Sequence, residues 1–244
     1  MTIKVFAPAK VNLTLHITGQ RDDGYHLLDS LVVFVSAGDE LCLTEAVEMS
    51  LNVSGPYAKG VPNDASNLVW RAAELCELSA EIALEKHLPN AAGIGGGSAD
   101  AAAVVRAAQA LGRAPKEDVA TLGADVPVCM SSAPQRMSGI GEVLAPCSKL
   151  PELWMVLVNP IKDVPTPAVF RALKQKANPA MEADLPTWDD AHSFCEWLAG
   201  QRNDLEAPAI EIEPVIGQVL DLFPDALLAR MSGSGATCFG LYAD

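Results

Sequence analysis

Apolar and polar residues alternate with a period of two over residues 11–17, and this pattern predicts a half-buried β-strand. The same parity gathers polar side chains on one face of the strand, which carries Lys10, Asn12, Thr14 and His16. Further strands are predicted over residues 28–35 and 40–44, with the turn residues Gly38 and Asp39 between them. We therefore expect the chain to begin with strands.

The middle of the chain changes to helical patterns around a glycine-rich turn. A helix is predicted over residues 68–77, after a polar loop that ends in the capping residue Asn67, and a strand over residues 82–86. Four glycines then fall within five positions of the segment 89–100. The alanine-rich residues 101–111 predict a long helix that the next glycine ends.

The second half of the chain mixes both kinds of element. A strand is predicted over residues 154–159, a helix over 166–174, and an exposed loop rich in Pro, Asp and Glu over 178–188. Helical patterns and then strand patterns follow at residues 188–199, 214–222, 226–231 and 236–242. Since helices and strands do not alternate strictly, the predicted fold class is α+β.

Composition narrows the class of protein. The 244 residues include 17 basic and 31 acidic side chains, a net charge of −14, which argues against a general nucleic-acid binder. The six cysteines show neither zinc-ligand nor redox-motif spacing, which favours small buried side chains in a reducing compartment. The longest apolar runs are strand-sized and no signal-peptide pattern occurs, so we expect a soluble cytoplasmic protein.

The glycine-rich segment is the strongest candidate for chemistry. Glycine exposes backbone N–H groups at the positive end of a helix dipole, where phosphate groups bind. A tight turn or close helix packing is the alternative. No Walker A string occurs, and the glycine spacing does not fit a dinucleotide-binding fingerprint. These features favour an ATP-using small-molecule kinase.

Several short motifs, in order along the chain, resemble those of one enzyme superfamily. Ala-Pro-Ala-Lys-Val-Asn-Leu at residues 7–13, the segment 89–102, and Ser-Gly-Ser-Gly-Ala at residues 232–236 are similar to the three signature motifs of the GHMP kinases. A narrower resemblance, to members acting on a cytidine-diphosphate substrate, rests on Asp-Gly-Tyr-His, Gly-Ala-Asp-Val-Pro and Pro-Thr-Pro, at residues 23–26, 123–127 and 165–167.

The resemblance implies a fold and an activity. The fold would be two α+β domains, residues 1–150 with the ATP-binding glycine loop and residues 151–244, with the active site in the cleft between them. ATP would phosphorylate the 2-hydroxyl group of cytidine-diphosphate-linked methylerythritol in non-mevalonate isoprenoid biosynthesis. The implied cofactors are ATP, as co-substrate, and Mg²⁺, which follows from the chemistry of ATP and has no recognisable ligands in the sequence.

The resemblance also implies roles for particular residues. The catalytic pair would be Lys10 and Asp125, with Asp125 taking the proton of the alcohol. The substrate-binding residues would be Asn12, Tyr25, His26, Thr166 and Phe170, with Tyr25 and Phe170 on the two faces of the cytosine ring. The ATP-binding residues would be Asn67, Lys86, Pro89, Gly93, Ile94, Gly95, Gly96, Gly97, Ser98 and Ala99.

Several of these residues, and also Asp100, have an alternative interpretation without a role in catalysis or ligand binding. Lys10 and Lys86 suit a solvent-exposed surface, and Asp125 suits a helix cap. Tyr25 suits a packed surface position. Asp100 suits the helix dipole at its N-terminus, or alternatively a role through Mg²⁺.

Alternatives remain open for the whole protein as well. It could be another GHMP-type small-alcohol kinase, or a catalytically inactive nucleotide-binding module. We also expect that residues are missing from the sequence near 78–81 and 120–122 and after its last residue, because the connections there are short for the family. The sequence does not predict the oligomeric state.

Overall fold

The computed structural model describes residues 1–147 and 149–244. The chain forms two compact units. Unit 1 contains residues 1–10, 34–90 and 95–132, and unit 2 contains residues 11–33, 91–94 and 133–244. This division differs from the predicted boundary at residue 150. The reason is that two long strands, β1 (Thr2–Asn12) and β3 (His26–Glu45), each contribute residues to both units.

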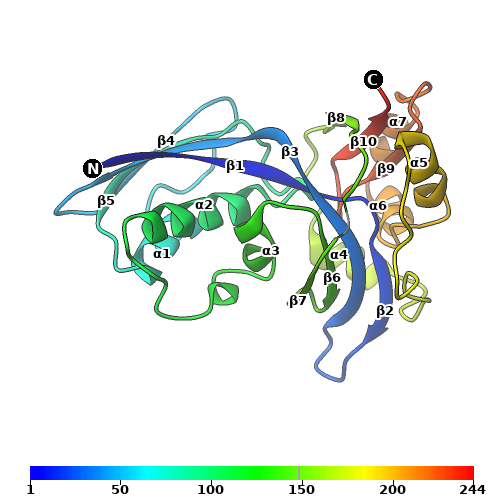
Figure 1. Ribbon diagram of the computed structural model, residues 1–244, viewed down its shortest axis with the longest axis horizontal. Helices are drawn as coiled ribbons and strands as arrows, with labels where there is room; N and C mark the ends of the chain where they lie inside the picture. Colours follow the sequence, from blue (N-terminus) through cyan, green and yellow to red (C-terminus); the bar gives the residue numbers. More distant parts are fainter. Residues whose placement is uncertain (148) are drawn as a thin grey trace. The chain divides into compact units, whose positions relative to one another are not determined.

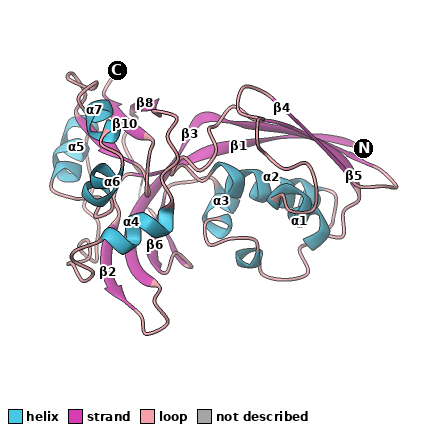
Figure 2. Cartoon of the chain, turned by 180° about the vertical axis from the view of Figure 1, so that it is seen from behind, coloured by secondary structure: helices cyan, strands magenta, loops and turns pink. Residues whose placement is uncertain are grey.

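Unit 1 is a sheet with helices along one face. Strands β1 and β3 are joined there by β4 (Ser50–Ser54) and β5 (Ala80–Glu85), with β5 antiparallel to β3 and parallel to β4. The helical elements are α1 (Leu68–Leu75), α2 (Gly96–Ala110), the short 3-10 helix η1 (Val119–Thr121) and α3 (Val126–Ser131). Figures 1 and 2 show α1, α2 and α3 on the same side of these strands.

The core of unit 1 lies between this sheet and its helices. Strand side chains alternate, so that Leu41, Leu43, Ile82 and Leu84 are buried. Helix α2 is buried on nearly every side, which explains why it consists mainly of alanine and valine. The prediction of strand, glycine turn and long helix is confirmed.

Unit 2 contains two groups of strands. The first part of β3 pairs antiparallel with β2 (His16–Gln20) and with β6 (Gln135–Gly139), and β6 pairs with β7 (Val143–Pro146). A separate antiparallel sheet has the order β8-β10-β9, made of β8 (Trp154–Val158), β10 (Cys238–Tyr242) and β9 (Leu228–Met231).

Among the residues that the structure describes, four helices complete unit 2. They are α4 (Thr166–Ala172), α5 (Ala191–Ala199), α6 (Glu206–Ile212) and α7 (Val215–Leu220). The apolar core of the unit joins residues from β2, α4, α6, α7, β9 and β10, including Ile17, Val169, Ala209, Ile216, Met231 and Cys238. The expected α+β class is confirmed in both units.

Strand β3 differs from the prediction, because it runs unbroken through the expected turn at Gly38 and Asp39. Gly38 allows a close approach instead of a turn, since a Cβ there would lie 2.4 Å from the Ala7 carbonyl oxygen and 2.5 Å from the Phe6 ring. Asp39 is wholly buried and bonded, as described below. Tertiary contacts decide the conformation of the chain at both residues, and the local sequence pattern does not show such contacts.

The prediction of one half-buried strand over residues 11–17 is wrong. β1 ends at Asn12 and β2 begins at His16, and the polar as well as the apolar side chains between them are buried. The polar ones find partners inside unit 2. For example, the Thr14 hydroxyl accepts a hydrogen bond from the Leu31 N–H, and the Ser30 hydroxyl donates to the Thr14 carbonyl oxygen.

In the structure of this sequence the chain runs without a break near residues 78–81 and 120–122, and the expectation of missing residues at these two places stays a prediction. After α1 the chain turns at Glu77, which has a left-handed φ of 49°, and the Leu78 N–H then bonds to the Ala73 carbonyl oxygen. The turn needs no glycine. The short segment at 119–121 is η1.

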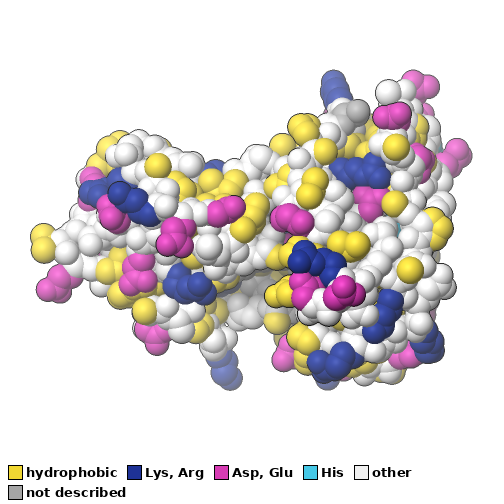
Figure 3. All heavy atoms as spheres, turned by 90° about the horizontal axis from the view of Figure 1, so that it is seen from below, with side chains coloured by type: hydrophobic (Ala, Val, Ile, Leu, Met, Phe, Trp, Pro, Cys, Tyr) yellow, Lys and Arg dark blue, Asp and Glu magenta, His cyan; other side chains and the backbone are white. Residues whose placement is uncertain are grey.

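The surface carries charges of both signs. On the face shown in Figure 3, Lys and Arg side chains are interspersed with Asp and Glu side chains. Within residues 1–147 and 149–244, no helix is long and apolar enough to span a membrane.

Candidate active site

Unit 1 places Lys10 directly against Asp125. The Lys10 Nζ atom lies 2.7 Å from Asp125 Oδ2, and the two residues are separated by 115 positions in the sequence. The Lys10 side chain is 5% exposed and that of Asp125 is 37% exposed, so a molecule outside can reach the carboxylate. The structure therefore brings the predicted catalytic pair together and makes Lys10 a buried residue, not a surface lysine.

Asp125 stands at the N-cap position of α3, but its side chain makes no capping hydrogen bond. Pro127 in the first turn lacks an N–H group, which reduces the number of donors that a cap would have to satisfy. Burial raises the pKa of the neighbouring Cys129 thiol to about 12, so this thiol is neutral at physiological pH. Asp125 is therefore the anionic group beside Lys10, and its carboxylate is not used as a helix cap.

The glycine-rich loop begins α2 next to this pair. Gly95 has a left-handed φ of 64°, and a Cβ there would lie 3.3 Å from Lys10 Cβ. The first turn of α2 leaves backbone N–H groups without helical partners at Gly96, Gly97 and Ser98. Gly97 is exposed and Ser98 half-buried. Oriented N–H groups at a helix N-terminus fit phosphate oxygens, and these lie in the same unit as the catalytic pair.

Two of the predicted ATP-binding residues are engaged in bonds within unit 1. The Asn67 Oδ1 atom accepts a hydrogen bond from the Val69 N–H at 2.9 Å and caps α1, while its Nδ2 donates to Pro62 O. Lys86 is 3% exposed and contacts the carboxylates of Asp39 and Asp100. Lys86 is thus not the solvated lysine of the alternative interpretation. The remaining predicted ATP-binding residues lie between positions 89 and 99. Among them, Pro89 is half-buried, and Ile94 and Ala99 are buried.

In unit 2, Asn12 lies beside the start of the glycine-rich segment and the third motif. Its backbone N–H donates to Ser232 Oγ at 3.0 Å, and that hydroxyl donates to the Gly93 carbonyl oxygen at 2.9 Å. The Asn12 Nδ2 group donates to Ser30 Oγ at 2.8 Å. Among the described residues, nothing hydrogen-bonds to the buried Asn12 Oδ1 atom. An acceptor is therefore available at this position.

Gly93 permits the close approach of the third motif. It has φ of 73°, and a Cβ there would lie 2.5 Å from the Ser232 carbonyl oxygen and 2.7 Å from that of Gly235. The Asn203 amide supports the same turn, because its Nδ2 group donates to the Met231 and Gly233 carbonyl oxygens. This close packing explains why glycine occurs both at residue 93 and in the third motif.

Four more of the predicted substrate-binding residues, His26, Phe170, Tyr25 and Thr166, lie in unit 2. His26 lies against Phe170, with ring centroids 4.9 Å apart and planes tilted by 33°. Tyr25 is 61% exposed, so its ring remains open to a ligand. Thr166, at the start of α4, shares a hydrogen bond of 2.7 Å with Ser234. The structure brings His26 to Phe170 and leaves Tyr25 on the surface.

His26 has a free polar atom. Its Nε2 atom is buried and has no hydrogen-bond partner among the described residues. Burial, together with the positive charge of Lys176, lowers the pKa of His26 below its usual value. A neutral ring with a free nitrogen can exchange a hydrogen bond with the edge of a base.

The sequence patterns did not indicate some residues of these sites. Asn203 supports the third motif, and Asp39 holds Lys86. Asp39 has one possible signal in the sequence, since a strand over these residues would place it on the same face as the apolar Leu41 and Leu43. Asn203 lies in a segment where polar residues are common, and no local signal distinguishes it.

Comparisons with known proteins identify related kinases. Family models described as GHMP kinases N terminal domain and GHMP kinases C terminal match residues 67–145 and 179–244. The chain is 61% identical to 4-diphosphocytidyl-2-C-methyl-D-erythritol kinase of Dinoroseobacter shibae, over 97% of the chain and 84% of that protein. It is 56% identical to the kinase of the same name from Ruegeria pomeroyi, over 99% of the chain and 89% of that protein.

Solved structures give the same result. A crystal structure of 4-(cytidine 5'-diphospho)-2C-methyl-D-erythritol kinase matches with a TM-score of 0.77 and 36% identity, over 98% of the chain and 90% of that structure. A homoserine kinase from Cytophaga hutchinsonii matches with a TM-score of 0.62 at 20% identity, over 100% of the chain and 85% of that structure. The second match supports the fold alone.

Proposed function

This chain belongs to the GHMP kinase family of small-molecule kinases, and we propose that it uses ATP to phosphorylate the 2-hydroxyl group of 4-diphosphocytidyl-2-C-methyl-D-erythritol. This reaction is a step of non-mevalonate isoprenoid biosynthesis. The observation that carries the proposal is the contact of Lys10 with Asp125 beside Gly95. The identity of 61% to a kinase named for this substrate supports the choice of alcohol.

The catalytic pair suits transfer to an alcohol. As the alcohol oxygen bonds to the γ-phosphorus of ATP, its O–H bond breaks and the Asp125 carboxylate takes the proton. The bond from the γ-phosphorus to the bridging oxygen breaks at the same time, and ADP leaves. The Lys10 ammonium stabilises the negative charge on the transferred group, and the N–H groups at the start of α2 bind phosphate oxygens.

Mg²⁺ accompanies ATP in kinases generally. Within residues 1–147 and 149–244, no group of three or more His, Cys, Asp or Glu side chains suits a metal ion. Asp100, the acid closest in sequence to the loop, is 2% exposed and ion-paired with Lys86. The side chains present do not by themselves form a magnesium site, and the mechanism assigns no step to the ion.

Two features support the cellular setting and the substrate class. Cys76, Cys129 and Cys195 are buried, which fits the small buried side chains expected in the reducing cytoplasm, where we place the enzyme. The charges of both signs in Figure 3 suit a small charged substrate better than a nucleic acid.

The proposal is tested by incubating the purified protein with ATP, Mg²⁺ and the cytidine substrate. Mass spectrometry should detect a product one phosphoryl group heavier, and ADP should form in equal amount. Parallel reactions with homoserine and mevalonate test the other small-alcohol kinases of the family. Transfer to one of these, or ADP formation without any acceptor, would contradict the proposal.

A substitution at Tyr25 tests the cytosine site. We expect Tyr25→Ala to raise the KM for the cytidine substrate roughly tenfold, because stacking on a base contributes about 1 kcal/mol beyond buried area. The KM for ATP should stay unchanged. Trp154→Ala is the matched control, since Trp154 is an equally exposed aromatic residue (62%) on β8. Equal KM values for the Tyr25 variant and the wild type would remove Tyr25 from the site.

A further inference from the structure

A cluster of three charged side chains is buried in unit 1, below the start of α2. Lys86, Asp39 and Asp100 have relative exposures of 3%, 0% and 2%. The Lys86 ammonium contacts Asp39 and lies 2.7 Å from Asp100 Oδ2. Buried charges lose their hydration, and such a group persists only when its members are bonded to one another. We refer to these three residues as the Lys86 cluster.

The Lys86 cluster ties together three segments that precede and form the glycine-rich loop. Asp39 Oδ1, on β3, accepts hydrogen bonds from the backbone N–H groups of His87 and Leu88, at 2.6 and 2.8 Å. These two residues follow β5 and lead to the loop. Asp100 lies in α2, one turn after Gly96. The contacts of Lys86 therefore join β3, the end of β5 and the first turns of α2.

The cluster also lies close to the loop at Gly96. A Cβ on Gly96 would lie 3.6 Å from Lys86 Nζ and 3.7 Å from Asp39 Oδ2. Gly96 is the first residue of α2 and carries one of the N–H groups available to a phosphate. A shift of Lys86 or Asp39 would therefore change the packing next to the Gly96 backbone.

We propose that the Lys86 cluster positions the glycine-rich loop for the nucleotide, so that Lys86 acts through the backbone of Gly96 and not by direct contact with ATP. This rests on the proposed function only in naming ATP as the nucleotide. It gives Lys86 a role different from the predicted ATP contact. Since Lys86 is a positioning residue in this account, its partners must matter for nucleotide binding as much as Lys86 itself.

Nucleotide affinity distinguishes the two roles of Lys86. We expect Asp39→Asn to raise the Kd for ADP about tenfold or more, because it places an amide N–H₂ group against the ammonium and releases Lys86. Lys86→Met should have an effect of similar size. The kcat at saturating ATP should change less than threefold in both variants, because Lys10 and Asp125 are paired with each other and both remain in place. A direct ATP contact instead predicts weak binding by the Lys86 variant alone.

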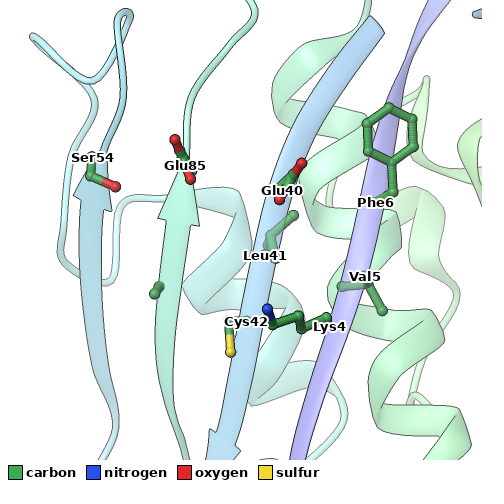
Figure 4. Close-up of a pocket in the computed structure, with 9 residues that line it drawn as sticks. Lys4, Val5, Phe6, Glu40, Leu41, Cys42, Ser54 and Glu85 are labelled. Atoms are coloured by element: carbon green, nitrogen blue, oxygen red, sulfur yellow. The ribbon is translucent and has the colours of Figure 1, made fainter. Parts of the chain in front are cut away.

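Glu40→Gln is the matched control for Asp39→Asn. Figure 4 shows Glu40 and Glu85 on the neighbouring strands β3 and β5, where they line an open groove of about 380 Å³. Glu40 is the next residue to Asp39 but is exposed, so its neutral variant should bind ADP like the wild type. If Asp39→Asn binds ADP within twofold of the wild type, the proposal is wrong.

Removing one charge from a buried cluster can prevent folding. The triple variant Lys86→Met, Asp39→Asn and Asp100→Asn removes all three charges of the cluster, so it leaves no buried charge without a partner and should fold. It should still bind ADP about tenfold more weakly, and wild-type affinity would overturn the proposal. ADP binding needs no alcohol substrate. A wild type that binds ADP but phosphorylates no alcohol would therefore refute the proposed function and leave this comparison intact.

The charge of the cluster gives a second test. Two carboxylates and one ammonium sum to −1, and Asp100 Oδ1 is buried without a hydrogen-bond partner among the described residues. Burial raises the pKa of Asp100 from 3.8 to about 7, against the opposing effect of Lys86. The groups that face Asp100 are Lys86, Asp39 and Cys129, whose thiol stays neutral because burial raises its pKa to about 12.

Asp100→Asn should therefore alter the pH dependence of stability. In the wild type, the proton on folded Asp100 stabilises the protein below pH 3.8, and this stability is lost as the pH rises through about 7. The variant has no such proton, so its Tm minus that of the wild type should increase from pH 4 to pH 7 and then level off. Its Kd for ADP should rise as it does for Asp39→Asn, because Asp100 is the second partner of Lys86. A Tm difference that is constant with pH would contradict this account of the cluster.

Discussion

Asp125→Asn is expected to lower kcat by roughly two orders of magnitude or more, because an amide cannot take the alcohol proton in the transition state. The Kd for ATP should change little, since Asp125 is not among the N–H donors at the start of α2. Steady-state kinetics with the cytidine substrate, together with calorimetry for nucleotide binding, measure both quantities. The substitution is nearly isosteric, so the protein should fold normally.

Asp190→Asn is the control for this variant. Asp190 also stands at a helix N-cap, but its carboxylate accepts a hydrogen bond from the Ser193 N–H and so caps α5. Asparagine caps helices about as well as aspartate, so kcat and Tm should both stay near their wild-type values. If Asp125→Asn turns over within threefold of the wild type, Asp125 is not the base and the mechanism is wrong.

Gly93→Ala is expected to destabilise the protein by roughly 2–5 kcal/mol, from the left-handed backbone and from overpacking against two carbonyl oxygens. Those oxygens belong to Ser232 and Gly235 and would lie 2.5 and 2.7 Å from the new methyl group. Backbone atoms cannot move aside as the end of a flexible side chain can. Urea unfolding measures the change in free energy, and the KM for ATP should rise because the glycine-rich segment shifts.

Gly112→Ala separates the two contributions. Gly112 has φ of 78°, close to the 73° of Gly93, but a Cβ there meets nothing within 4 Å. Only the backbone strain remains, so this variant should lose roughly 1–2 kcal/mol and keep a normal KM for ATP. Equal losses in the two variants would show that contact with the third motif does not restrict Gly93.

The helices and loops that depend on local sequence signals lie where the sequence predicts them. Helix α2 begins and ends where glycine-rich residues meet an alanine-rich run, because helix propensity and the termination signal act within a few residues. Helix α4 starts at Thr166, as Pro167 indicates. The segment 178–188 is a loop as predicted, although Met181 within it is buried and its N–H bonds to Asp29.

In the candidate site, the sequence identified the residues and the tertiary structure determined how they are arranged. The motifs identified Lys10 and Asp125 as a pair, and the structure places their charged atoms 2.7 Å apart. No periodicity could give that distance, because 115 residues separate the two and packing of α3 near β1 decides it. The contact between His26 and Phe170 is likewise a tertiary one, and the prediction that the base lies between Tyr25 and Phe170 stays untested.

The sequence by itself determined the order of elements, the α+β class, the glycine turn before a helix, and the family whose motifs name the reacting groups. Only the tertiary structure decided which polar residues are buried. Asp39 reads as a turn residue and Lys86 as a solvated one, yet each is buried because the other supplies the compensating charge. Such compensation depends on atoms 47 positions apart, and local patterns cannot contain it.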